Sequence, residues 1–236
     1  MTYDSRELQE WQSTKNAFVL EKASSMISNL ISMTSKMEVN HIFDLRIFKG
    51  GSIALYAKLF NPNKIIAVDY VAEPVHALDE FVTESGLADH VRLYYGVDQS
   101  DQVAMADILS KEFPNRDIDL VVDDASHFYH ETKTSFNLIF PYLRPGGLYI
   151  IEDWAWAHWS GDFWQEHGGV WPDKPALTNL VVEILMLSAS RPDLIDDVLI
   201  NHNTVFVRRG YAELTEKDVD VLSYCLTRGK GFVPIL

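Results

Sequence analysis

Residues 121–154 read VVDDASHFYHETKTSFNLIFPYLRPGGLYIIEDW and predict two buried strands joined by a helix. The strands are the apolar runs at 117–124 and 148–153, and each run ends in two acidic residues. Between them, the apolar residues of segment 131–143 recur at helical spacing, and a Pro-Gly-Gly turn leads into the second run. A strand, a helix and a strand in this order indicate parallel strands joined by a crossover helix.

The same alternation continues on both sides of this unit. Further strands are expected at 41–47, 64–69, 91–95, 197–200 and 204–208, and further helices at 5–36, 53–60, 73–85, 101–112 and 176–190. The last two strands are short and close together, so residues 201–203 are expected to form the turn of a hairpin. The sequence therefore predicts an α/β fold with a doubly wound, Rossmann-like sheet of seven strands, one of them antiparallel.

Length and charge limit the possible classes of protein. The 236 residues fit one domain, 1–236, in which 1–38 form a helical lid or dimerisation arm and 154–175 a Trp-rich insertion. A single cysteine excludes an intramolecular disulfide framework and a multi-cysteine zinc site. The net charge of −14 argues against nucleic acid or an anionic membrane as the main partner. The chain starts without a secretory signal and has no membrane-length apolar stretch, so a cytoplasmic protein is expected.

Polar residues follow the first three strands, where doubly wound sheets bind their ligands. A glycine pair precedes a helix, and an acid at the end of the second strand can bind the two hydroxyls of a ribose. Because the glycines do not form GxGxxG, a nucleoside such as S-adenosylmethionine is favoured over a dinucleotide, although a glycine pair is also common in plain turns. The expected cofactor-binding residues are Gly50, Gly51, Ser52, Asp69, Asp98, Gln99 and Asp123.

Two acidic pairs, Asp123–Asp124 and Glu152–Asp153, end strands that are expected to be neighbours about 4.8 Å apart. Carboxylates gathered in one place repel one another, and a divalent cation relieves that repulsion. Oxygen ligands suit Mg²⁺, Ca²⁺ or Mn²⁺. His127 follows Asp124 by one helical turn and can face the same cleft. The alternatives are solvated acids paired with basic residues, an aspartate that caps the next helix, and a surface histidine.

Three stretches carry a family resemblance together with 121–154: DLRIFKGGS at 44–52, AVD at 67–69 and GVDQSD at 96–101. Over residues 40–155 the chain resembles metal-dependent class I S-adenosylmethionine O-methyltransferases that act on sugar hydroxyls. This branch includes macrocin-type enzymes, cephalosporin hydroxylase-like relatives and mycobacterial methylmannose polysaccharide methyltransferases.

The resemblance implies roles for four residues. It implies that Asp124, Glu152 and Asp153 bind Mg²⁺ and that His127 is the general base. The chain departs from the family at Arg46 and Ala125, where the family usually has glycine. Arg46 would lie beside the methionine part of the cofactor, where it either crowds that site or points away.

Five of the six tryptophans lie between Trp154 and Trp171, directly after the second acidic pair. Indole rings pack against the apolar faces of sugars, and their N–H groups donate hydrogen bonds. An acceptor site is therefore expected at Trp154, Trp156, His158 and Trp159. The alternative is a satellite core or a dimer interface, where aromatic residues are also enriched.

These features favour a Mg²⁺-dependent O-methyltransferase that uses S-adenosylmethionine to methylate a sugar or polyol hydroxyl. Its acceptor would be a small molecule or an oligosaccharide, and a homodimer is expected. A second hypothesis is a catechol or phenol O-methyltransferase, because vicinal oxygens of a catechol can chelate the same metal. A third is a non-catalytic accessory protein, which Arg46 and the hydroxylase-like relatives suggest.

Overall fold

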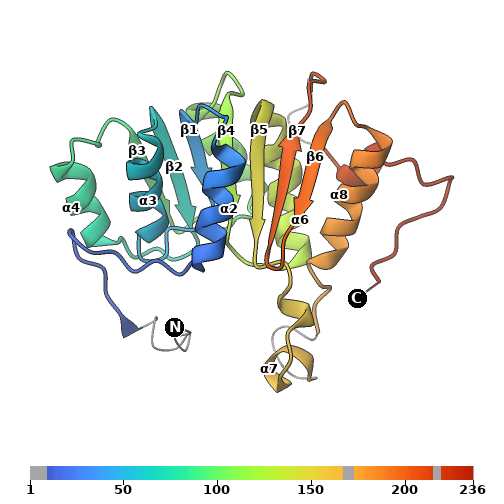
Figure 1. Cartoon of the computed structure of the whole chain (residues 1–236), viewed down its shortest axis with the longest axis horizontal. Helices are drawn as coiled ribbons and strands as arrows, with labels where there is room; N and C mark the ends of the chain where they lie inside the picture. Colours follow the sequence, from blue (N-terminus) through green and yellow to red (C-terminus); the bar gives the residue numbers. More distant parts are fainter. Residues whose placement is uncertain (1–9, 167–172, 215–218, 236) are drawn as a thin grey trace. The chain divides into compact units, whose positions relative to one another are not determined.

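The computed structural model describes residues 10–166, 173–214 and 219–235 (Figure 1). The chain divides into two compact units, Met1–Asp98 and Gln99–Leu236, and each is described by itself. No helix in the described ranges is long and apolar enough to cross a membrane.

The first unit contains three parallel strands in the order β3-β2-β1. They are β1 (His41–Asp44), β2 (Lys64–Asp69) and β3 (Val91–Tyr95), and the helices are α2 (Ser24–Thr34), α3 (Gly51–Phe60) and α4 (His76–Glu84). Residues 65–68 of β2 are all buried, as expected for a strand covered on both faces.

The second unit contains four strands in the order β4-β5-β7-β6. β4 and β5 are parallel, whereas β7 is antiparallel to both β5 and β6. The strands are β4 (Ile118–Asp123), β5 (Leu143–Glu152), β6 (Ile195–Ile200) and β7 (Thr204–Arg209). The helices are α5 (Gln102–Glu112), α6 (Tyr129–Ile139), α7 (Asp162–Gln165) and α8 (Thr178–Ser190), with short 3₁₀ turns η1 (Phe140–Tyr142), η2 (Trp156–His158) and η3 (Val221–Tyr224).

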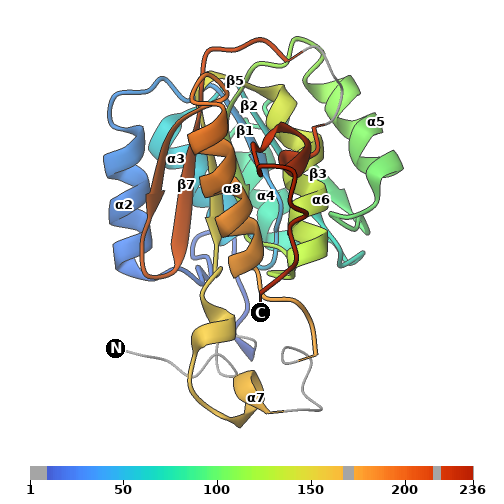
Figure 2. The ribbon, with the colours of Figure 1, turned by 90° about the vertical axis from the view of Figure 1, so that its right-hand side faces the viewer.

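The seven strands confirm the predicted fold class, with β7 as the antiparallel strand. Asp123 pairs with Ile151 in the β4–β5 register, so the acids after the two strands reach the same edge. Glu152 pairs with Thr204 in the β5–β7 register, which places the β6–β7 turn beside Asp153. The Trp-rich segment leaves the sheet at this edge, and Figure 2 shows α7 extending beyond the end of β5.

The predicted helix at 5–36 is wrong over much of its length. Only Ser24–Thr34 form the helix α2, whereas residues 11–23 are irregular and 5–9 lie outside the described residues. The Ser13 hydroxyl donates to the Lys49 carbonyl oxygen at 2.7 Å and accepts from the Val19 N–H at 3.0 Å. Such side-chain bonds to backbone groups compete with helix formation.

The predicted boundary between the helix at 131–143 and the next strand is also shifted. The helix α6 ends at Ile139, and β5 begins at Leu143 rather than at residue 148. The expected Pro-Gly-Gly turn at 145–147 therefore lies within β5, where the β4–β5 register is irregular and Gly146 has a φ of +77°. A glycine at positive φ allows such a bulge without ending the strand.

Candidate active site

The two acids at the end of β4 have different surroundings. Asp123 is 2% exposed and accepts hydrogen bonds from Ser135 Oγ at 2.7 Å, Tyr149 Oη at 3.0 Å and Gln99 Nε2 at 3.3 Å. Burial raises the pKa of Asp123 to about 6, although the bonds from Ser135 and Tyr149 oppose that rise. Asp123 therefore belongs to a buried polar network.

Gln99 extends this network to the loop that carries His127. Its Nε2 also donates to Ser135 Oγ at 3.0 Å, and its Oε1 accepts from the Ser126 N–H at 2.7 Å. Gln99 is 5% exposed, and both its amide nitrogen and its amide oxygen form hydrogen bonds inside the second unit. The described contacts of Asp123 and Gln99, which were expected to bind cofactor, thus hold the loop 124–127 in place.

Three of the four residues expected at the metal and base site lie together. Asp124, His127 and Asp153 each offer one ligand atom, and these atoms lie within 4.8 Å of one another. His127 Nε2 is 3.8 Å from Asp124 Oδ1. Glu152 is buried but is not a member of this group. The geometry therefore brings two carboxylates and one imidazole into a compact group whose ligand atoms are close enough to share one cation.

His127 is held in an unusual backbone conformation. Its φ is +58°, a left-handed conformation that costs a non-glycine residue roughly 1–3 kcal/mol. Its Nδ1 lies 3.4 Å from the Glu152 carbonyl oxygen, and its ring centroid is 4.2 Å from that of Trp156. If Nδ1 carries the proton, it donates a hydrogen bond to the Glu152 carbonyl oxygen. Nε2, which lies on the side of Asp124, is then unprotonated. Residues around His127 thus fix the direction in which its second nitrogen points.

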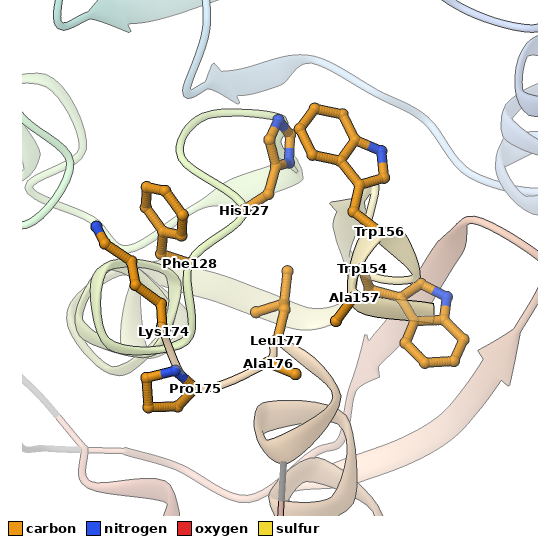
Figure 3. A pocket seen from close by; sticks show the side chains of 9 residues that line it. All are labelled: His127, Phe128, Trp154, Trp156, Ala157, Lys174, Pro175, Ala176 and Leu177. Atoms are coloured by element: carbon orange, nitrogen blue, oxygen red, sulfur yellow. The ribbon is translucent and has the colours of Figure 1, made fainter. Parts of the chain in front are cut away.

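A pocket opens beside His127 (Figure 3). Most of its lining is apolar, and Trp154 and Trp156 come from the expected acceptor set. The polar lining residues are His127 and Lys174; the Lys174 ammonium lies 3.5 Å from the centre of the Phe128 ring. The remaining lining residues are Ala157, Pro175, Ala176 and Leu177. The pocket therefore combines apolar side chains with the imidazole of His127 and the ammonium of Lys174.

The other two expected acceptor residues do not line this pocket. His158 is exposed, and its Nε2 lies 2.6 Å from Thr178 Oγ1. Trp159 packs against Trp156 and Trp164, with centroid distances of 5.9 and 5.4 Å. Trp154 and Trp156 therefore line the pocket. Trp159 and Trp164 pack against Trp156 and do not line the pocket. Trp171 lies outside the described residues.

In the first unit, Asp69 binds the backbone of the loop after β1. Its Oδ2 accepts from the Ile47 and Phe48 N–H groups at 2.9 and 2.7 Å, and its Oδ1 accepts from the Val71 N–H at 2.8 Å. A carboxylate has about four acceptor sites, so these bonds leave one for a ligand. Asp69 thus shapes the glycine loop whether or not it also contacts a ribose. Asp98 is exposed, and Ser52 lies in the first turn of α3.

The glycine pair is packed against the segment that precedes α2. Gly50 has a φ of +81°, and a Cβ on Gly51 would lie 2.2 Å from the Val19 carbonyl oxygen. The need for glycine at position 51 therefore comes from the chain itself, because the backbone of Val19 fills the space of a side chain. From the sequence alone, we expected Gly51 to be required for cofactor binding.

Gly51→Ala is expected to lower the free energy of unfolding by about 1–3 kcal/mol, because the new methyl group would force the Val19 backbone away. Denaturation in urea would measure the change. Gly231→Ala is the matched control, since a Cβ there meets nothing within 4 Å, and a change within about 0.5 kcal/mol is expected. Equal effects of the two substitutions would contradict the packing of Val19 on Gly51.

Arg46 turns toward the same N-terminal segment. Its guanidinium lies 3.5 Å from Glu21 Oε2 and 4.7 Å from the centre of the Phe48 ring. In this conformation the side chain is occupied by residues of the first unit. Whether this conformation crowds the methionine part of the cofactor or points away from it stays a prediction.

Four contributors to the site were not expected from the sequence: Ser135, Tyr149, Asn203 and Lys174. Ser135 and Tyr149 lie inside a helix and a strand, where they look like ordinary structural residues. Asn203 was expected only as part of a turn. No local pattern marks any of them, because each contacts a group that is distant in sequence.

Comparison with known proteins adds to this geometry. Residues 47–154 match a family described as a methyltransferase domain. This segment is similar to that methyltransferase domain. It contains the glycine loop, Asp69 and the whole Asp124–His127–Asp153 group, whereas Arg46, Trp156 and Asn203 lie outside it.

Two curated relatives are O-methyltransferases. Demethylmacrocin O-methyltransferase of Streptomyces fradiae is 30% identical over 176 residues, which are 68% of this chain and 40% of that protein. The 8-demethyl-8-alpha-L-rhamnosyl tetracenomycin-C 2'-O-methyltransferase of Streptomyces olivaceus is 31% identical over 110 residues, which are 47% of this chain and 25% of that protein. The chain thus spans less than half the length of these relatives.

A solved structure has a similar fold. It is the MycE methyltransferase from the mycinamycin biosynthetic pathway in complex with Mg, SAH and mycinamycin VI. The TM-score is 0.60 at 24% identity, and the match covers 80% of this chain and 49% of that one. This similarity confirms the class I methyltransferase fold.

Proposed function

We propose that the protein is a Mg²⁺-dependent O-methyltransferase that transfers the methyl group of S-adenosylmethionine to a hydroxyl of a sugar on a small molecule. The observation that carries the proposal is the placement of Asp124, His127 and Asp153 within 4.8 Å of one another, beside an aromatic pocket. The methyltransferase domain supports the reaction class. The rhamnosyl group in the name of one relative supports a sugar acceptor.

The donor set fits a hard divalent cation. Asp124 and Asp153 would hold it through carboxylate oxygens, which Mg²⁺ prefers. Glu152, the last residue of β5, directly precedes Asp153. Two carboxylates this close repel each other, so a cation lowers the free energy of the site. When bound, the ion would supply positive charge that orients the acceptor oxygens and lowers the pKa of the hydroxyl.

The first unit offers groups for the cofactor. The N-terminus of α3 has Gly50 at its cap and no side-chain cap among the described residues, so its N–H groups suit the carboxylate of S-adenosylmethionine. Asp69 keeps one acceptor site for a ribose hydroxyl. Arg46 is held by Glu21 and Phe48. When bound, the cofactor would supply the electrophilic methyl group.

His127 is the group placed to remove the hydroxyl proton. An imidazole has an ordinary pKa near 6.5, so it accepts a proton at neutral pH and releases it to solvent afterwards. The Glu152 carbonyl and the Trp156 ring hold this imidazole in one orientation. Much of the rate would come from such alignment of base and acceptor.

Binding and turnover together test the proposal. Calorimetry should show S-adenosylmethionine binding to the full chain, and transfer of a labelled methyl group should occur with glycosylated acceptors in the presence of Mg²⁺. Turnover of catechols but not of sugars would replace the sugar acceptor by a phenol. No binding of S-adenosylmethionine with or without Mg²⁺ would overturn the proposal in favour of an accessory protein.

Trp156→Ala is expected to lower kcat/KM for the acceptor by about tenfold, because it removes a pocket wall and the ring that packs on His127. Steady-state kinetics with varied acceptor would measure the change. Trp159→Ala is the control, since Trp159 belongs to the same cluster but not to the pocket lining, and a change below about threefold is expected. A larger effect at Trp159 than at Trp156 would assign the acceptor to a different surface.

A further inference from the structure

We propose that Asn203, in the turn between β6 and β7, is a positioning residue of the metal site. Its side-chain amide would hold the Asp153 carboxylate in the orientation that binds the ion. The inference rests on the proposed function, because it assumes that Asp153 is a metal ligand.

Two hydrogen bonds join Asn203 to Asp153. The Asn203 Nδ2 group donates to Asp153 Oδ1, and the Asp153 N–H donates to the Asn203 carbonyl oxygen at 2.8 Å. The first bond fixes the carboxylate of Asp153, one of whose oxygens lies within 4.8 Å of ligand atoms of Asp124 and His127. Groups that hold a ligand carboxylate in this way commonly tune metal affinity.

The fold explains why a residue so distant in sequence reaches this acid. Glu152 pairs with Thr204 across β5 and β7, so Asp153, directly after β5, lies beside Asn203, directly before β7. The turn is closed by a bond from the Asn201 N–H to the Thr204 carbonyl oxygen at 2.8 Å. Trp154 Nε1 donates to the Asn201 carbonyl oxygen at 3.1 Å. The turn is therefore fixed to the segment on both sides of Asp153.

The conformation of Asp153 also depends on this turn. Asp153 has a φ of +57°, a left-handed conformation that persists only where surrounding contacts impose it. The two bonds from Asn203 are such contacts. The Asn203 Oδ1 atom is buried and has no hydrogen-bond partner among the described residues, so it remains available to a water molecule on the ion.

The chemistry of an amide suits this role better than a charged group. A lysine or arginine at position 203 would neutralise Asp153 and compete with the cation. An aspartate would add like-charge repulsion in the absence of the ion. Asparagine donates a hydrogen bond while leaving the negative charge of Asp153 intact.

Binding of Mn²⁺, measured by electron paramagnetic resonance on the full chain, tests the inference. Asn203→Ala is expected to weaken Mn²⁺ binding by about 10-fold or more, the usual effect of removing a group that orients a ligand. Asn203→Ser keeps a donor and should recover part of the affinity. Asn201→Ala is the matched control, because Asn201 Nδ2 has no partner among the described residues and the bond from Trp154 goes to the Asn201 backbone, which the substitution keeps. Its affinity should stay within about twofold of the wild type.

Asn203→Asp separates positioning of the ion from simple support of the turn. A second carboxylate against Asp153 should lower the unfolding midpoint in EDTA and give a larger rise on addition of Mn²⁺ than the wild type shows. Wild-type Mn²⁺ affinity in a folded Asn203→Ala protein would overturn the inference and leave the proposed function intact. Failure of the wild type itself to bind Mn²⁺ would overturn both.

Discussion

His127→Ala is expected to lower kcat for methyl transfer by about 10³-fold while the protein stays folded, because a positioned general base contributes about 10²–10⁴-fold. His127 is buried, its ring packs on Trp156, and its Nε2 lies 3.8 Å from Asp124. Single-turnover assays with saturating cofactor and acceptor would measure the loss.

A second variant and a control make this result specific. Asparagine adopts positive φ more readily than most residues, so His127→Asn keeps the backbone at +58° while removing the base. His130→Ala is the control, because His130 is exposed on the first turn of α6 and should keep near-wild-type activity. Full activity of a folded His127→Asn protein would show that another group takes the proton.

The proposed metal site has His127 as well as two acids within 4.8 Å of one another, so the base and ligand roles of His127 must be distinguished. A base that does not bind the ion predicts Mn²⁺ affinity within about threefold of wild type in His127→Asn, since removal of a ligand or of its supporting group costs 10–100-fold. A large loss of affinity would make His127 a ligand and remove it as the base.

Removal of the divalent cation is expected to abolish turnover, and addition of Mg²⁺ should restore it. Asp124→Asn should lower kcat/KM by about 10²–10³-fold, and Mg²⁺ at ordinary concentrations should not rescue it, because a carboxylate ligand has been replaced by a neutral amide. Activity before EDTA, after EDTA and after return of Mg²⁺ would be compared for wild type and variant.

Asp197→Asn is the matched control for this loss of charge. Asp197 is an exposed acid on β6 in the same unit, so its substitution should change activity by less than about twofold. Turnover that survives EDTA in the wild type would contradict a metal-dependent reaction. Loss of activity in both variants would point to net charge rather than to the Asp124 ligand.

Elements with strong periodicity were predicted well from the sequence. The strands at 64–69 and 91–95 match β2 and β3, and β7 differs from its prediction by one residue. In the described part of the helix expected at 5–36, Ser13 donates to the Lys49 carbonyl oxygen and accepts from the Val19 N–H, and these bonds are not helical ones. The sequence pattern therefore predicted the strands well. It failed for the segment before α2, because a hydrogen bond to a residue distant in sequence replaces helical bonds there.

The candidate site shows the same division. The motif 121–154 placed Asp124, His127 and the acids after β5 at one sheet edge, because parallel strands bring their carboxyl ends together. It assigned Asp123 to the cofactor and Asp124 to the metal, but it did not predict the bonds that Ser135 and Tyr149 donate to Asp123. It also gave Trp154, Trp156, His158 and Trp159 equal weight, whereas only the first two line the pocket.

The sequence by itself determined the fold class, the strand ends that carry acids and the segment that contains His127, because these follow from short-range periodicity and residue type. Only the tertiary structure decided which of those acids lie together and what holds them. Asp123 meets Tyr149 across 26 residues, and Asp153 meets Asn203 across 50. Hydrogen bonds over such separations depend on sheet register and chain crossings, which no local pattern specifies.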